Sequence, residues 1–111
     1  MPIIATTLIA SKNIEDAQTV QYVATNVTAI IDKFTATNFS SGMVNVSVNL
    51  AASGETAGNS NLIVNTKTLQ AGETYTFPEL VGHVLRPGNF ISTLASASSA
   101  VNMRASGREF S

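Results

Sequence analysis

The clearest pattern along the chain is a strict alternation of apolar and polar residues between Met43 and Ala51. The apolar positions are Val44, Val46, Val48 and Leu50, and the polar positions between them are Asn45, Ser47 and Asn49. Successive side chains of a strand point to opposite faces, whereas a period of two cannot keep four residues on one helical face. The pattern therefore predicts a strand with one buried face.

Three more segments of the first half are typical of strands because they are rich in β-branched residues: Ile3–Ile9, Thr19–Ala24 and Val27–Phe34. In the last of them, Val27, Ala29 and Ile31 share one face. Residues 1–11 are expected to form either an edge strand or an extended arm. Spaced Ala and Val residues between Ile14 and Asp32 leave a helix as the alternative for that stretch.

The second half is divided by turn residues into shorter strands. Ser53–Ser60 is a polar loop containing glycine, and Leu62–Leu69 is predicted to follow it as a strand. Gln70–Glu73 is a turn into the strand Thr74–Phe77. Pro78 is expected to close that strand, because proline has no N–H for the ladder.

Arg86–Asn89 is the strongest turn signal, since Pro-Gly at the two central positions favours a type II turn. Two strands are predicted after it, Phe90–Ala95 and Val101–Ala105, with a turn at Ser96–Ser99 between them. Gly107 is expected to end the last strand. With turns about every ten residues, the chain is predicted to be all-β, with about seven to nine short antiparallel strands in a sandwich or small barrel that occupies residues 1–111 as one domain.

Charged residues make up only 12% of the chain, about half the usual share, while Ser, Thr and Asn together supply roughly a third. Such a surface has few charges to desolvate on docking, which suits a protein with much of its area in an interface. The net charge is −1 without a basic stripe, so nucleic acid is not an expected partner. Cysteine is absent, which excludes thiol chemistry.

The sequence contains no apolar run of membrane-spanning length, and its N-terminus lacks the basic start of a signal peptide. We therefore expect a protein made in the cytoplasm that has no membrane partner.

Catalytic and metal-binding patterns are not found. His83 is the only histidine, which argues against a zinc or cupin-type iron site, and we expect it to be a solvent-accessible loop or strand-end residue. No Gly-x-Ser-x-Gly motif is present. Glu73 and Glu79 are interpreted as solvated strand-end charges and not as a carboxylate pair for sugar hydrolysis. We predict no catalytic residue, no cofactor and no metal, and hence a protein that is not an enzyme.

The C-terminal half contains two sequence runs that resemble those of a known kind of domain. Residues 69–78 read LQAGETYTFP and residues 85–91 read LRPGNFI. These runs resemble jelly-roll domains in which an AGExYxF strand leads into a hairpin containing Pro-Gly. Together with residues 94–96 and 101–109, the region is similar to capsid decoration (cement) proteins of short-tailed phages, of the epsilon-fifteen type. The motifs are mainly turn and strand chemistry, and the likeness in length and character spans most of the chain.

This resemblance implies a jelly-roll-like antiparallel β-sandwich. It also implies a structural virion protein on the capsid exterior, which bridges neighbouring subunits of the major capsid protein as a homodimer and stabilises the shell against the pressure of packaged DNA. The alternative is a carbohydrate-binding β-sandwich module of a phage tail or fibre, with Tyr22 or Tyr75 as an exposed platform. The residues expected to form the interface are Ile3, Ile4, Leu8, Ile9, Arg104 and Arg108, and the Ser53–Ser60 loop is either a further contact or a mobile tip.

Overall fold

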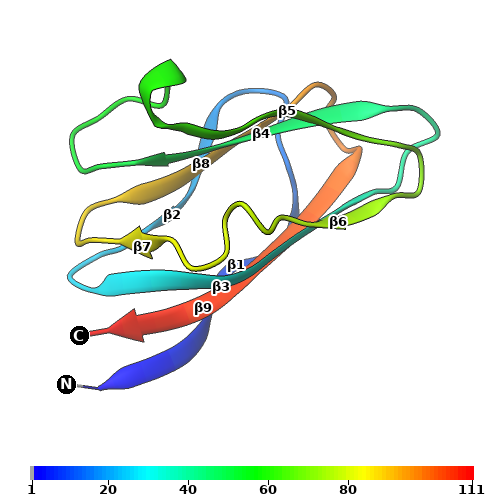
Figure 1. Cartoon of the computed structure of the whole chain (residues 1–111). Coiled ribbons are helices and arrows are strands. Elements are labelled where there is room, and N and C mark those ends of the chain that lie inside the picture. The colour runs from blue at the N-terminus through cyan, green and yellow to red at the C-terminus, as the bar shows by residue number, and fades with distance from the viewer. Residues whose placement is uncertain (1) are drawn as a thin grey trace.

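The computed structural model describes residues 2–111 and consists of two antiparallel β-sheets packed face to face (Figure 1). Sheet A has the order β1-β9-β3-β6, with β7 also on β3; its strands are β1 (Ile3–Asn13), β9 (Val101–Phe110), β3 (Thr28–Asn38), β6 (Thr74–Thr76) and β7 (Val84–Leu85). Sheet B has the order β2-β8-β4-β5; its strands are β2 (Thr19–Val23), β8 (Phe90–Ala95), β4 (Val44–Ala51) and β5 (Leu62–Leu69). One 3-10 turn, η1 (Asn59–Asn61), precedes β5.

The strand pairing is that of one long hairpin rolled into two layers. From its tip to its ends, β4 pairs with β5, β3 with β6 and β7, β2 with β8, and β1 with β9. Rolling brings β9 beside β3 and β8 beside β4, which closes the two sheets. With β6 and β7 taken as two parts of one interrupted strand, this is the eight-stranded jelly-roll connection. The predicted antiparallel sandwich of seven to nine strands is confirmed.

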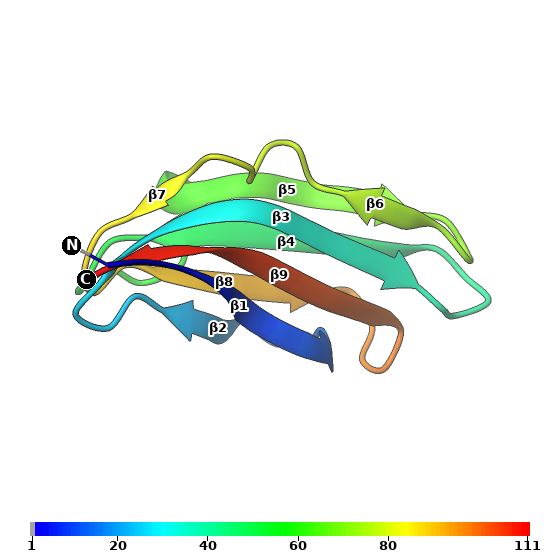
Figure 2. The same ribbon diagram turned by 90° about the horizontal axis from the view of Figure 1, so that it is seen from below.

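Both chain ends lie at the same end of the sandwich, where β1 and β9 pair from Ile3 opposite Phe110 onward (Figure 2). The backbone N–H of Ser111 donates to the carbonyl oxygen of Pro2 at 3.3 Å, which continues the ladder to the last residue. The two termini therefore belong to neighbouring strands of sheet A.

The core lies between the sheets and is filled by the inward positions of nearly every strand. Phe34 and Phe77 meet edge to face with ring centroids 5.3 Å apart, and Tyr75 packs on Phe77 at 4.7 Å. The residues between β6 and β7 stay attached to β3, because Phe77 N–H donates to Phe34 O and Gly82 N–H donates to Ile31 O. The segment between β6 and β7 thereby places Phe77 and Leu80 in the core, both with 0% exposure.

The helix considered between Ile14 and Asp32 is not formed, because β2 and β3 occupy this stretch. Within β3, Ala29 and Ile31 point inward before a bulge between Ile31 and Lys33, and Phe34 points inward after it. A bulge adds one residue to one strand and so shifts which positions are buried.

Gly107 does not end the last strand, which continues to Phe110. It is buried between β1 and β3, and a Cβ atom there would lie 2.1 Å from the carbonyl oxygen of Ile30. Glycine is needed at this position because the backbones approach closely, and not because the strand stops.

The two predicted turns are confirmed by their geometry. Gly88 has a φ of +89° and Asn89 N–H donates to Arg86 O at 2.9 Å. Gly72 has a φ of +78° and Glu73 N–H donates to Gln70 O at 3.0 Å. β6 ends at Thr76, two residues before Pro78, whose missing N–H keeps it out of the ladder.

Candidate binding surface

One edge of sheet A is formed by β1, an 11-residue strand that pairs only with β9 within residues 2–111, and the other edge by the short β6 and β7. A strand with one unpaired edge presents a row of N–H and C=O groups to which another strand can add. Ile3 and Ile4 lie at the start of this edge and are 61% and 56% exposed. The edge is therefore long, apolar at one end and open to a partner.

The expected interface must be corrected at Leu8 and Ile9. Both side chains are buried, with 6% and 3% of their surface exposed. A register shift between Thr7 and Ile9 explains why two successive side chains point inward. The extra residue in β1 reverses the alternation, so that these side chains pack into the core. They stabilise the sandwich and are not available to a partner.

Arg104 and Arg108 lie on the outer face of sheet A, on alternate outward positions of β9. Arg104 reaches across β1, where its guanidinium lies 3.3 Å from Thr7 Oγ1 and 3.4 Å from Ser11 Oγ. Arg108 forms an ion pair with Asp32, with Nη2 2.8 Å from Oδ1. The hydrogen bond with Asp32 raises the pKa of Arg108, and the charge of this arginine is already neutralised by its partner.

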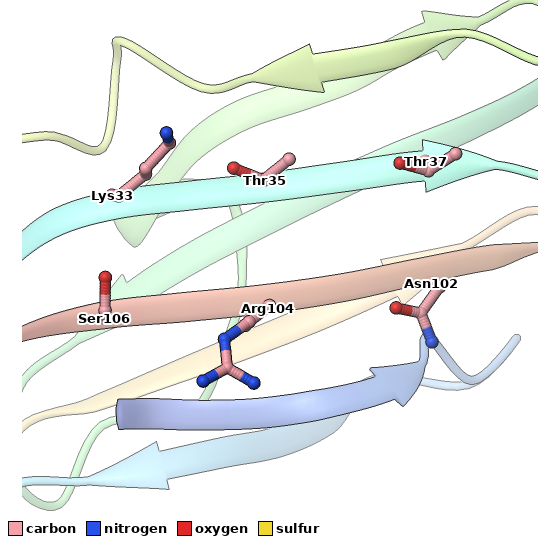
Figure 3. Close-up of a pocket in the computed structure, with 6 residues that line it drawn as sticks. All are labelled: Lys33, Thr35, Thr37, Asn102, Arg104 and Ser106. Carbon is pink, nitrogen blue, oxygen red and sulfur yellow. The ribbon is translucent and has the colours of Figure 1, made fainter. Parts of the chain in front are cut away.

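A shallow depression of about 350 Å³ lies on the same outer face between β3 and β9 (Figure 3). It is lined along β3 by Lys33, Thr35 and Thr37, and along β9 by Asn102, Arg104 and Ser106. Lys33 and Arg104 form no ion pair within residues 2–111. The depression thus combines two unneutralised cations with hydroxyl and amide groups.

Lys33 was not among the residues predicted from the sequence, although a signal for it exists. Lys33, Thr35 and Thr37 alternate with the buried Phe34, Ala36 and Asn38, which is the period of two expected for β3. The alternation was obscured by the bulge at Asp32, after which the outward positions change parity.

Groups capable of other chemistry are dispersed. His83 is exposed in the turn before β7, as predicted. Glu73 and Glu79 are used locally: Glu73 accepts from the backbone N–H of Gln70 at 2.7 Å, and Glu79 accepts from the Tyr75 hydroxyl at 3.0 Å. Within residues 2–111, no group of three or more His, Asp or Glu side chains is placed to hold a metal ion.

The two tyrosines are engaged with their own surroundings. Tyr22 is half-buried and donates its hydroxyl to Glu109, and desolvation together with this carboxylate raises the pKa of Tyr22 strongly. Tyr75 packs on Phe77, and the ammonium group of Lys67 lies 4.4 Å from the centre of its ring. Neither ring is therefore presented as a free platform for a sugar.

Comparisons with protein-family models, with curated proteins and with solved structures found no match for this chain. Among residues 2–111, no helix has the length and apolar character needed to cross a membrane.

Proposed function

We propose that this chain is a non-enzymatic structural protein of a phage virion, which binds the outside of the capsid and bridges neighbouring subunits of the major capsid protein. The observation that carries the proposal is the placement of a free edge strand, β1, beside two unneutralised cations on the outer face of the same sheet. The jelly-roll sandwich and the family resemblance of the C-terminal half support it.

The edge strand is suited to a second copy of the chain. Two β1 strands can pair antiparallel about a two-fold axis, because such a contact uses the same patch on both copies. Ile3 and Ile4 would then be covered, which accounts for their exposure in the single chain. The pair would join two sheets A into one continuous sheet with its outer face on one side.

The outer face of sheet A is suited to the capsid. Lys33 and Arg104 from each copy would place four cations on the joined face, which favours a partner surface that carries carboxylates. Because each copy holds a different capsid subunit, release of one contact leaves the other to promote rebinding.

The area available is sufficient. A stable contact buries roughly 1,200–2,000 Å² in total, or about 600–1,000 Å² on each partner. The chain exposes 5591 Å², so this is roughly a tenth to a fifth of its surface. Two such contacts would together cover roughly a fifth to a third of the exposed surface.

The test is co-sedimentation of the purified protein with empty capsids built from the major capsid protein encoded in the same genome. Saturation at a fixed ratio to the capsid subunit is expected. The double substitution Lys33→Ala, Arg104→Ala should weaken binding at least tenfold at low salt, and Arg86→Ala, which removes an exposed arginine elsewhere, should not. A folded protein that does not sediment with the capsids would refute the proposal.

The dimer is tested separately by analytical ultracentrifugation. Ile4→Lys places a charge on the β1 edge and should shift the protein towards the monomer, because charged residues on an edge oppose strand addition. Met43→Lys is the matched control, since Met43 is 67% exposed and lies outside β1. Equal sedimentation of wild type and Ile4→Lys would show that β1 is not the contact between copies.

A further inference from the structure

A second surface lies on the outer face of sheet B, on the side opposite the cationic face of sheet A. Three adjoining depressions of about 240, 290 and 400 Å³ lie there and share lining residues. Gln18 borders two of them, and Ser47, Thr66 and Leu94 also border two. We refer to the three depressions together as the sheet B groove. The loop that precedes β5, together with η1, lies beside the groove, on the side of sheet B that faces away from sheet A (Figure 1).

The floor of the sheet B groove is made of neutral hydrogen-bonding side chains, including Gln18, Ser47, Asn49 and Ser92. Asp16 and Glu55 are the charged residues that border it, and both are acidic. Apolar surface is interleaved with the polar floor and comes from Val20, Phe90 and Leu94.

The polar floor is fixed by hydrogen bonds. Asn49 and Ser92 are 2% and 1% exposed although they lie on the outer face of the sheet. The amide nitrogen of Gln18 donates both to Ser92 Oγ at 2.7 Å and to Asn49 Oδ1 at 3.3 Å. Since both N–H groups are used, Gln18 Oε1 remains as an acceptor for a ligand.

The wall of the groove is tied to the floor. Asn49 Nδ2 donates to Asn61 Oδ1 at 2.8 Å and to the carbonyl oxygen of Gly58 at 2.9 Å. Asn61 in turn donates to the carbonyl oxygen of Thr56 at 3.1 Å. The loop predicted as a capsid contact or a mobile tip is thus anchored over sheet B. An array of polar groups that is already ordered loses little entropy when it binds a ligand.

We propose that the sheet B groove binds a neutral oligosaccharide. Sugar hydroxyls both donate and accept hydrogen bonds, which matches the exposed amides and hydroxyl of Gln18, Asn45 and Thr66 in the lining, and the C–H faces of sugar rings match the apolar strips between them. Asp16 and Glu55, without a neighbouring cation in the lining, disfavour sulfated, phosphorylated or carboxylated sugars. A peptide strand could add only at the outer edge of β2 or β5, because β8 and β4 are paired on both edges, and it would then lie beside the groove and not in it.

The experiment is a glycan array that contains neutral and acidic glycans, followed by titration calorimetry with the best neutral glycan. Binding to neutral glycans is expected. Gln18→Ala should weaken it about tenfold, the loss expected for one or two hydrogen bonds, and Gln70→Ala is the matched control at an exposed turn. Asn45→Arg should block the groove, while Asn13→Arg on β1 should not.

Three results would overturn the inference: no glycan bound by the wild type, a preference for acidic glycans, or unchanged binding by both groove variants that circular dichroism shows to be folded. The inference is independent of capsid attachment, and the two fail separately. Arg104→Ala should leave glycan binding unchanged, and Gln18→Ala should leave capsid co-sedimentation unchanged.

Discussion

The close packing around Gly107 gives a sharp prediction for stability. In Gly107→Ala, the new Cβ would lie 2.1 Å from the carbonyl oxygen of Ile30 and 2.9 Å from Leu8 Cδ1. The leucine can rotate away, but the carbonyl oxygen belongs to the backbone of β3, so β3 and β9 must move apart. Overpacking a core costs about 1–3 kcal/mol, and a contact with the backbone of a central strand belongs at the upper end.

The matched control is Gly42→Ala, because a Cβ at Gly42 meets nothing within 4 Å and Gly42 is not among the glycines with positive φ. That substitution should leave the unfolding free energy unchanged or raise it by about 0.4–1 kcal/mol, since alanine restricts the unfolded chain.

The assay is urea denaturation followed by circular dichroism, with a thermal melt as the second readout. For 111 residues, an unfolding entropy of about 2.1 cal/mol/K per residue converts a loss of about 3 kcal/mol into a fall in Tm of roughly 13 °C. If the unfolding free energies of Gly107→Ala and Gly42→Ala agree within about 0.5 kcal/mol, the argument from close backbone approach is wrong.

Two further predictions concern buried polar contacts. Asn38→Ala should lower the unfolding free energy by about 2 kcal/mol in urea denaturation, because Asn38 is fully buried and donates to the carbonyl oxygens of Gly42 and Leu69; an equal loss in the exposed control Asn59→Ala would contradict this. Tyr22→Phe should reduce the loss of unfolding free energy that the wild type shows as the pH rises into the alkaline range. Desolvation and Glu109 raise the pKa of Tyr22 in the folded state, so above about pH 10 only the unfolded chain loses this proton and wild-type stability falls. An unchanged slope of the unfolding free energy against pH in Tyr22→Phe would refute the assignment.

The alternation in residues 43–51 was sufficient to predict β4, because each Val of that strand is buried on one face regardless of its partners. Asn49 shows where the pattern falls short. It occupies a polar, outward position in the sequence, yet it is 2% exposed, because a loop nine to twelve residues later folds over it. No local pattern records such a covering, and the sheet B groove was therefore not predicted.

The interface predicted from the sequence also depended on features that only the tertiary structure shows. Ile3 and Ile4 are exposed and Leu8 and Ile9 are buried, although the four have similar side chains and lie on one strand. A bulge opposite β9 decides which of them point into the core, and it is visible only once the strands are paired. Likewise, Lys33 and Arg104 come to line one depression because β3 and β9 are neighbours in sheet A.

By itself, the sequence determined most of the strands but not β7 or the full length of β9, together with the turns at Gln70–Glu73 and Arg86–Asn89 and the all-β class, because alternation, glycine and proline act through local backbone geometry. The tertiary structure alone decided the order of the strands, the buried role of Gly107, and the two surfaces on opposite sides of the sandwich. These features depend on which distant segments pair and on where bulges shift the register, and such contacts join residues that are far apart in the sequence.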